Sequence, residues 1–246
     1  MPAITLTDLT LGYERHPAVH HLSGIFQPGS MTAVVGPNGS GKSTLVKGIV
    51  GILRPLGGRI ERQNMKKHEI AYLPQQLEID RSFPITVLDT VILGLWRQIG
   101  IFGGMKRELW AKAEQALRTV GLTGFEMRAI SELSGGQFRR VMFARMLLQD
   151  SPVVVLDEPF TSIDSQTTID LLKMIQRWHA EKRTIIAVLH DFNQVRDHFP
   201  ETLLIAREMI GWGPTAEILC DENLTLSRTM SAAWDDEAEI CAEERV

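Results

Sequence analysis

The sequence predicts an α/β fold in which a largely parallel sheet is joined to an antiparallel β segment and to an inserted group of helices. Short β-branched apolar runs alternate with segments of helical period, which is the pattern of a parallel sheet covered by helices. The first 30 residues instead resemble antiparallel strands, and helical pattern replaces strand pattern between residues 84 and 150. A length of 246 residues, of which 44% are hydrophobic and 23% charged, fits one domain with an insertion and excludes a disordered chain.

The strands follow from these runs in chain order. Antiparallel strands are expected at residues 3–7 and 19–26, closed by the turn pair Pro28-Gly29. Five β-branched apolar runs predict buried strands, at residues 32–35, 69–73, 153–156, 184–189 and 202–205.

The helices follow from apolar periodicity and capping residues. The helix expected at residues 165–180 has four apolar residues at the spacing of one helical face: Leu171, Met174, Ile175 and Trp178. Thr86 can cap a helix through residue 93, and residues 106–120 and 134–149 predict two more. We therefore expect one domain over residues 1–230, with a core at 1–83 and 151–230 and a helical subdomain at about 84–150.

The charge of the chain is concentrated at its C-terminal end. Residues 231–246 are expected to form an acidic tail, with six acidic residues and one basic residue after position 234. This segment carries a net charge of −5 and the whole chain −4, so the rest of the chain carries +1 and is close to neutral. It lacks the basic face that nucleic-acid binding requires.

A glycine-rich loop follows the strand expected at residues 32–35. Eight residues match the pattern G-x-x-x-x-G-K-[ST]: Gly36, Pro37, Asn38, Gly39, Ser40, Gly41, Lys42 and Ser43. Backbone N–H groups can point into such a loop, and the helix that follows adds partial positive charge, so the loop can hold phosphates. In this motif the lysine reaches the β- and γ-phosphates and the hydroxyl of Ser43 ligates Mg²⁺. The motif predicts a P-loop protein that binds a nucleotide with Mg²⁺, and it leaves kinases, small GTPases, recombinases and transporters open. The adjacent Thr44 is included in the nucleotide site, and a plain glycine turn is the alternative.

A second motif supplies acidic residues. The run at residues 153–158 is an apolar strand that ends in Asp157 and Glu158. Such a strand places Asp157 beside the phosphate loop, where it can hold Mg²⁺, and directs Glu158 toward the γ-phosphate. Glu158 is the candidate general base that orients the attacking water. Taken alone, an acidic pair at a strand end fits a solvated terminus equally well.

A third motif lies in the helical segment and consists of Leu133, Ser134, Gly135, Gly136 and Gln137. Ser134 can cap a helix and the two glycines permit close backbone approach, which makes a second anion site. This LSGGQ run resembles the signature of the ABC ATPases. The resemblance implies a RecA-like core, and a head-to-tail dimer in which the signature of one subunit contacts the ATP held by the phosphate loop of the other.

Four further positions match the ABC pattern in order. By this resemblance Tyr13 stacks on adenine, and Gln75 links Mg²⁺ and the attacking water to the helical subdomain. Asp164 shapes the dimer contact, and His190 contacts the γ-phosphate as a catalytic residue. The alternatives are that Tyr13 is an ordinary surface tyrosine, that the neighbouring Gln76 takes the glutamine role, and that His190 only begins a helix.

The segment at residues 82–94 narrows the resemblance. It is similar to the F-P-x-T-V-x-D-x-V-x-x-G run of zinc- and manganese-type importer ATPases, with the zinc branch favoured. No apolar run is long enough to cross a bilayer, as in the separate ATPase subunits of bacterial importers. The resemblance implies import of a divalent metal ion through an integral membrane permease, an extracytoplasmic metal-binding protein that supplies the ion, and a peripheral location at the cytoplasmic face of the inner (cell) membrane.

The sequence departs from this family in two places. Leu189 precedes His190 where the family often has a second histidine, and Phe138-Arg139-Arg140 replaces a more usual polar run after the signature. Neither departure falls on an expected phosphate contact.

Other functions are weighed against the importer. A soluble ABC ATPase for iron–sulfur cluster assembly is the alternative, and the run at residues 83–94 argues against it. A chromosome-maintenance or translation ABC protein would need a long coiled-coil insertion or two tandem nucleotide domains, with a basic surface, and the sequence shows none of these. The three histidines His16, His20 and His21 are interpreted as scattered surface residues, because no nearby acidic or thiol group completes a ligand set. Two cysteines near the C-terminus provide neither a metal cluster nor a disulfide framework.

Overall fold

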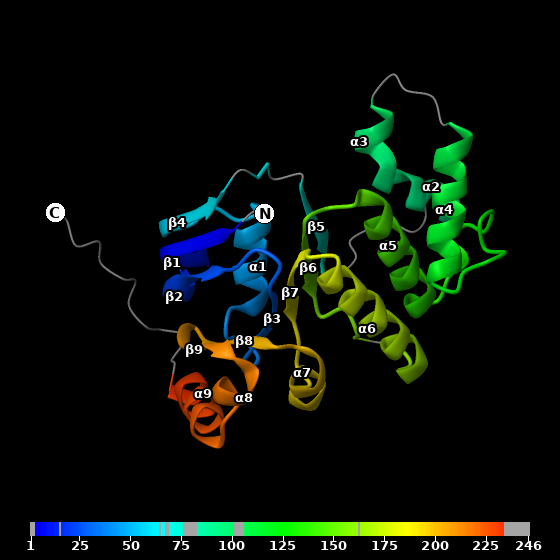
Figure 1. Ribbon diagram of the computed structural model, residues 1–246. Helices are drawn as coiled ribbons and strands as arrows, with labels where there is room; N and C mark the ends of the chain where they lie inside the picture. The colour runs from blue at the N-terminus through cyan, green and yellow to red at the C-terminus, as the bar shows by residue number, and fades with distance from the viewer. Residues whose placement is uncertain are drawn as a thin grey trace.

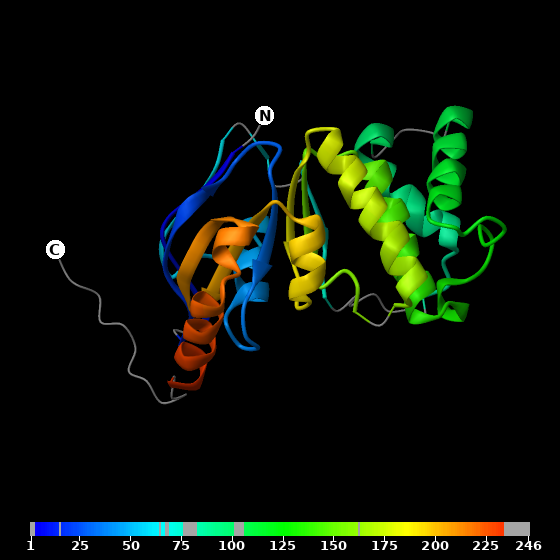
Figure 2. The ribbon, with the colours of Figure 1, turned by 60° about the horizontal axis from the view of Figure 1, so that its bottom comes forward.

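The computed structural model describes residues 3–14, 16–63, 65–66, 69–75, 83–100, 106–161 and 163–233. The expectations for Gln76, for residue 82 and for the acidic tail after residue 233 lie outside these ranges. The described elements form two sheets and a group of helices (Figure 1). In the turned view the larger sheet stands between the smaller sheet on one side and the long helices on the other (Figure 2). This confirms the predicted α/β class with an antiparallel β part and a helical insertion.

The larger sheet has six strands. Their order is β5 (Ile70–Leu73), β6 (Val153–Asp157), β7 (Thr184–Val188), β3 (Met31–Val35), β8 (Glu201–Ala206) and β9 (Glu208–Pro214). The first five pair in parallel, whereas β9 pairs antiparallel with β8. Every residue of β3, β6 and β7 is buried, as expected for β-branched strands covered on both faces. The five predicted buried strands are confirmed to within one residue at each end.

The smaller sheet is antiparallel and has the order β2 (His16–Phe26), β1 (Ile4–Tyr13) and β4 (Gly57–Arg62). The two predicted strands are present but longer than expected. Asp8 and His21 have φ of 48° and 47°, and the register of β1 against β2 shifts between Leu6 and Leu9. These irregularities interrupt the two-residue alternation, so the pattern stops short of the true strand ends. The Pro28-Gly29 turn leads from β2 into β3.

The helical insertion lies between β5 and β6, which are neighbours in the sheet. It contains α2 (Val87–Ile92), a 3-10 turn (Leu93–Leu95), α3 (Trp96–Ile99), α4 (Arg107–Thr119) and α5 (Gly135–Gln149). The three predicted helices correspond to α2, α4 and α5. Figure 1 shows these helices grouped on one side of the molecule, with α5 nearest the strands. We call this group the helical lobe.

Two hydrophobic cores cover the two faces of the larger sheet. Val34 of β3 belongs to the core shared with the smaller sheet and with Leu45 of α1 (Lys42–Val50). Its neighbours Ala33 and Val35 belong to the opposite core, shared with α6 (Ser165–Ala180) and the helical lobe. Alternate residues of one strand thus pack on opposite sides.

The C-terminal third of the chain supplies the remaining helices of the fold. The predicted helix at residues 165–180 is α6, and its four predicted core residues are buried. After it come α7 (Phe192–His198), α8 (Thr215–Ile218) and α9 (Asp221–Ala233). The last helix continues past residue 230, where the tail was expected to begin. Within the described ranges, no helix combines the length and apolar character needed to cross a bilayer.

Candidate active site

Three neighbouring strands of the larger sheet end at one place. Because β6, β7 and β3 are adjacent and parallel, their carboxyl ends meet at the same edge of the sheet. The phosphate loop joins β3 to α1, Asp157 and Glu158 lie at the end of β6, and His190 follows β7. The fold therefore brings together three groups of residues that are more than 30 positions apart in the sequence.

The phosphate loop requires glycine at position 41. Gly41 has φ of 91°, and a Cβ atom there would lie 2.3 Å from the carbonyl oxygen of Ala18. Gly41 precedes α1, whose N-terminus has no side-chain cap. Backbone N–H groups at such an end can bind an anion. Of the remaining loop positions, Asn38 and Gly39 are exposed, Gly36 and Pro37 are half-buried, and Ser40 and Thr44 are buried.

The ammonium group of Lys42 lies inside this loop. Its side chain is buried, and Nζ donates hydrogen bonds to the carbonyl oxygens of Gly36 at 2.9 Å and Pro37 at 2.6 Å. Burial lowers the pKa of Lys42 to about 8, against the opposing effect of the carboxylates of Glu158 and Asp157. The site thus holds a cation that a phosphate would stabilise.

Ser43 and Asp157 form a pair of oxygen ligands beside Lys42. The Ser43 hydroxyl donates a hydrogen bond of 3.1 Å to Oδ1 of Asp157, which is 1% exposed. Burial raises the pKa of Asp157, and nearby Glu158 adds to this effect, while the hydrogen bond from Ser43 opposes it. A buried carboxylate next to a hydroxyl is a donor set that suits Mg²⁺, and a bound dication would offset the cost of the buried charge. These residues therefore fit the predicted metal.

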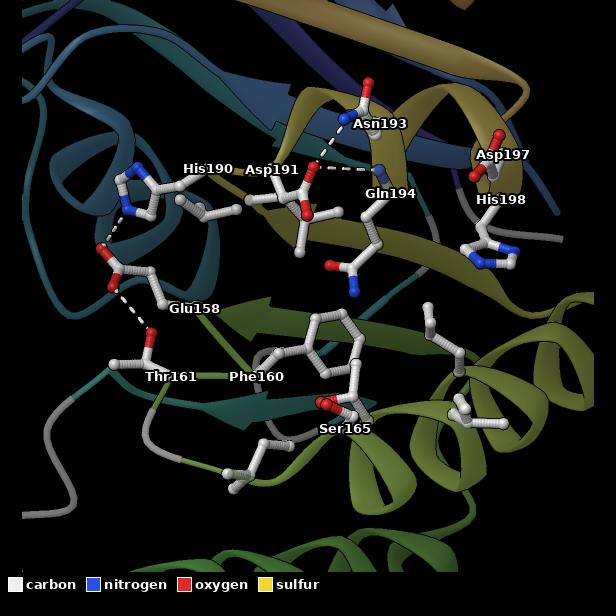
Figure 3. Close-up of a pocket in the computed structure, with 16 residues that line it drawn as sticks. Glu158, Phe160, Thr161, Ser165, His190, Asp191, Asn193, Gln194, Asp197 and His198 are labelled. Atoms are coloured by element: carbon white, nitrogen blue, oxygen red, sulfur yellow. Dashed lines mark hydrogen bonds and ion pairs between the residues drawn. The ribbon is translucent and has the colours of Figure 1, made fainter.

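Glu158 makes the hydrogen bonds expected of an ionised carboxylate. Its Oε1 lies 2.6 Å from Nε2 of His190, and its Oε2 accepts a hydrogen bond of 3.1 Å from the hydroxyl of Thr161 (Figure 3). Partial burial acts to raise its pKa, but the hydrogen bonds from His190, Thr161 and Gln75 and the charge of His190 outweigh it and lower the pKa. A carboxylate that is ionised at neutral pH can accept a proton from water.

The backbone of Glu158 is unusual. Its φ is 49°, in the left-handed region that residues with a side chain seldom adopt. Such conformations persist only where surrounding contacts enforce them, and they are common at functional sites. No sequence pattern reveals this conformation.

A cavity of about 590 Å³ opens beside Glu158, between α6 and α7. Figure 3 shows Glu158, Thr161 and His190 at one side of it and the residues of α7 at another. Asp191 caps α7 by accepting hydrogen bonds from the backbone N–H groups of Asn193 and Gln194. His190 therefore stands immediately before a helix cap, and at the same time pairs with Glu158.

Gln75 and Tyr13, the two remaining residues predicted to contact the nucleotide or its metal, lie in different parts of the core. Gln75 follows β5, and its side chain hydrogen-bonds Glu158. Tyr13 ends β1 and is 48% exposed. The ammonium group of Lys47 lies 5.9 Å from the centre of its ring and 3.5 Å from its hydroxyl oxygen. This contact with Lys47, from the second turn of α1, was not foreseen.

The signature residues form the N-terminus of α5 in the helical lobe. Ser134 is the N-cap: its hydroxyl accepts a hydrogen bond of 3.2 Å from the N–H of Gln137, whose side-chain oxygen accepts one of 3.0 Å from the N–H of Ser134. Leu133 is buried, whereas Ser134 and Gly135 are exposed. A Cβ at Gly135 would meet no atom of the described residues within 4 Å, so their packing does not require glycine there.

Asp164 is the N-cap of α6. Its Oδ1 accepts a hydrogen bond of 2.8 Å from the N–H of Thr167, and its side chain is 66% exposed. Hydrogen bonds from Thr167 are the main cause that lowers the pKa of Asp164. Arg140 of the signature helix lies 4.0 Å from its carboxylate. The exposed position leaves Asp164 accessible to a second molecule.

The interpretation of the three N-terminal histidines needs correction. All three lie on β2, but His20 is buried, and burial lowers its pKa. His21 also has an acidic neighbour, since its Nδ1 lies 2.8 Å from Oδ1 of Asp8 across the irregular β1–β2 pairing. No group of three or more His, Cys, Asp or Glu side chains suited to a metal occurs in the part of the chain that the structure describes.

Sequence reasoning missed the burial and the contacts of Arg139. This residue is 6% exposed, and its guanidinium donates hydrogen bonds to backbone carbonyls beside the catalytic candidates. The composition of α5 could have indicated a buried arginine, because charged residues are interspersed in an apolar run and no face of the helix is polar. A helix buried on most sides must pair its charged groups.

Comparison with known proteins places these observations in context. The family described as "ABC transporter" matches residues 19–161. The manganese transport system ATP-binding protein MntB of Listeria innocua is 35% identical over 225 residues, which are 90% of this chain and 94% of that protein. The zinc transport system ATP-binding protein TroB of Treponema pallidum is also 35% identical over 225 residues, covering 89% of this chain and 84% of the relative.

Solved structures show the same fold. One chain of a proposed metal-chelate type ABC transporter in an inward-facing conformation superposes with a TM-score of 0.80 at 30% identity, covering 93% of this chain and 90% of that one. A dimeric ATP-binding cassette in a post-hydrolysis state with ADP and phosphate superposes with a TM-score of 0.77 at 24% identity, covering 86% of this chain and 98% of that one.

Proposed function

Because the chain belongs to the ATP-binding proteins of ABC transporters, we propose that it is the ATP-hydrolysing subunit of an importer for a divalent metal ion, zinc or manganese. The proteins compared above belong by name to manganese and zinc transport systems, and they match nearly the whole chain at the same identity. The cargo ion crosses the membrane through a separate permease, and an extracytoplasmic metal-binding protein delivers it. The subunit acts at the cytoplasmic face of the membrane.

One observation carries the proposal of ATP hydrolysis: the catalytic candidates converge at the carboxyl ends of β3, β6 and β7. Lys42 and the N–H groups of the loop and of α1 bind the phosphates, with Thr44 next to them. Ser43, Asp157 and Gln75 hold Mg²⁺, which when bound neutralises charge on the β- and γ-phosphates.

The same convergence assigns roles in proton transfer. Glu158 accepts the proton of the attacking water, and His190, at 2.6 Å from Glu158, orients that carboxylate and faces the γ-phosphate. Tyr13 supplies the surface on which adenine stacks, because its exposed ring lies at the end of β1, the strand that packs against α1.

A second copy of the chain completes each site in this proposal. Gly135 is exposed and has open space in front of it, although none of the described residues around it requires a glycine. Close approach by another molecule explains the small residue, and the N-terminus of α5 would then present N–H groups to the ATP of the partner. Asp164 and Gly136 flank this face, and a Cβ at Gly136 would lie 3.6 Å from Ile163, the residue before Asp164.

The helical lobe offers a surface for the permease. Three large apolar side chains on and just before its first helices are exposed, namely Phe83 at 65%, Leu93 at 42% and Trp96 at 58%. Exposed aromatic side chains clustered in sequence are typical of a protein–protein contact rather than of a free surface. This placement supports docking of the membrane partner on the lobe.

Metal uptake in liposomes tests the proposal. The chain would be co-purified with a candidate permease from its own genome, reconstituted, and supplied with radioactive zinc or manganese at the extracytoplasmic side. We expect ATP-dependent uptake of one of these ions. The Glu158→Gln variant should still bind ATP but lose about 10²-fold or more in hydrolysis and uptake. Co-purification with a soluble scaffold instead of a permease would refute the transport proposal, and hydrolysis by Glu158→Gln at the wild-type rate would refute the role of Glu158.

A further inference from the structure

The guanidinium group of Arg139 connects the signature helix to both loops that carry the hydrolytic residues. Nη2 donates a hydrogen bond of 2.8 Å to the carbonyl oxygen of Gln75, and Nη1 donates to the carbonyl oxygens of Glu158 and, at 3.4 Å, Thr161. Arg139 itself belongs to α5. One side chain thus contacts the segment after β5 and the segment after β6.

The burial of Arg139 makes these contacts obligatory. The residue is 6% exposed, and burial lowers its pKa, against the opposing charges of Glu158 and Asp157. A buried charged group must be hydrogen-bonded, or it destabilises the fold. A planar guanidinium carries five N–H donors on three nitrogen atoms, so it can bind the carbonyl oxygens of separate segments in fixed directions, whereas a lysine or glutamine side chain has fewer donors, all on one nitrogen atom.

The carbonyl groups that Arg139 binds belong to residues whose geometry matters for hydrolysis. Glu158 has the left-handed φ of 49°, and its N–H is tied to the carbonyl oxygen of Val188 at 3.2 Å. Arg139 fixes the other side of the same residue by binding its carbonyl oxygen. Thr161 and Gln75, whose carbonyls Arg139 also binds, both hydrogen-bond the Glu158 carboxylate through their side chains. The described side chains that donate to the Glu158 carboxylate are those of His190, Thr161 and Gln75. Arg139 therefore binds the backbone of each of these residues except His190.

The position of Arg139 in α5 adds a link to the signature. It lies five residues after Ser134, the N-cap of the helix, and a hydrogen-bonded helix moves as a unit over that distance. From these contacts we infer that Arg139 is a positioning residue for ATP hydrolysis: it keeps Glu158 and Gln75 in the productive arrangement and makes that arrangement depend on the placement of the signature helix. This inference rests on the catalytic role proposed for Glu158.

The test compares Arg139→Gln with a matched change on the same helix. Arg145 is half-buried and also desolvated, and the Nε atom of its guanidinium has no hydrogen-bond partner among the described residues, so Arg145→Gln removes a second desolvated guanidinium from α5. Steady-state hydrolysis by the full chain should show a kcat lowered about 10- to 100-fold in Arg139→Gln, with KM for ATP changed less than about threefold. Arg145→Gln should leave kcat within about twofold of wild type, whatever its melting temperature.

A double-mutant cycle separates positioning from a general loss of structure. If Arg139 acts through Glu158, then adding Arg139→Gln to Glu158→Gln should lower single-turnover hydrolysis by less than about twofold. An undiminished 10- to 100-fold loss in that background would overturn the inference, as would a normal kcat with a raised KM in Arg139→Gln.

A conservative variant keeps the test decisive if Arg139→Gln does not fold. Arg139→Lys retains the charge but reaches fewer carbonyls, so its kcat should lie between those of wild type and the Gln variant. A wild-type kcat in Arg139→Lys would overturn the inference. Failure of the proposed function would be visible separately, because Glu158→Gln alone would then hydrolyse ATP normally.

Discussion

At the scale of the residue, the charged groups of the site differ in burial: Lys42 and Asp157 are buried, whereas Glu158 is partly exposed. Burial lowers the pKa of Lys42 and raises the pKa of Asp157, and both shifts favour the neutral form of the side chain. Glu158 differs, since its hydrogen bonds from neighbouring side chains lower its pKa in spite of partial burial. The charged forms of the residues assigned to phosphate and Mg²⁺ are therefore stabilised when a ligand of opposite charge binds. The proposed general base, Glu158, is ionised without such a ligand.

The pKa of Lys42 predicts how ATP affinity depends on pH. Burial lowers this pKa to about 8 in the free protein, and the negative charge of a bound triphosphate would raise it. Binding must then take up protons, and affinity must fall as pH rises above about 8. Calorimetric titrations in buffers of different ionisation enthalpy should show uptake of about half a proton at pH 8 and more at pH 9.

The Lys42 prediction has its own control. Lys42→Ala should lose most of its ATP affinity, and any residual binding should take up no proton in this range. Equal proton uptake by the wild-type protein and by Lys42→Ala at pH 9 would show that another group is responsible.

At the scale of the element, two helices of the lobe begin with the same device. In α2, the Thr86 hydroxyl accepts a hydrogen bond of 3.1 Å from the N–H of Asp89, whose carboxylate accepts one of 3.2 Å from the N–H of Thr86. In α5, Ser134 and Gln137 make the equivalent pair. Both are capping boxes on exposed helix ends, but only the second belongs to the signature.

These matched caps separate stability from function. Ser134→Ala and Thr86→Ala should each lower the free energy of unfolding by about 1 kcal/mol, because each removes one N-cap acceptor. Only Ser134→Ala should also lower ATP-dependent dimerisation and hydrolysis, since Ser134 is proposed to face the ATP of the partner. Urea unfolding, sedimentation with ATP and steady-state hydrolysis measure these effects. Equal hydrolysis by the two variants would count against a role of Ser134 beyond capping.

The sequence revealed the elements whose patterns are local. The β-branched strands, the caps Thr86 and Ser134 and the apolar face of α6 all follow from short-range rules. The strand β4 was missed because none of its residues is buried and it begins with two glycines. The left-handed Glu158 and the carbonyl contacts of Arg139 were missed for another reason: both arise where segments distant in sequence meet.

At the scale of the whole molecule, the proposed nucleotide site and the signature lie on different units. The phosphate loop belongs to the core built on β3 and α1, whereas Ser134 and Gly135 start α5 in the helical lobe. A head-to-tail pair related by twofold symmetry would form two equal sites, each combining the core of one copy with the lobe of the other. Within the chain, Arg139 provides a contact between the same two units.

Mixing two inactive variants tests this arrangement. Lys42→Ala removes the proposed phosphate-binding cation, and Gly135→Asp puts a carboxylate where the partner's ATP is proposed to bind, at a position where a Cβ meets no described atom of its own chain within 4 Å. Each variant alone should be inactive, because both of its sites carry the defect. In an equal mixture half of the dimers are mixed, and each has one site with neither defect, so hydrolysis should recover to about a quarter of the wild-type rate. If each site formed within a single chain, the mixture would show no recovery. As a control, Glu158→Gln is added to the Gly135→Asp chain, which supplies the core of the intact site, and the recovery must then disappear.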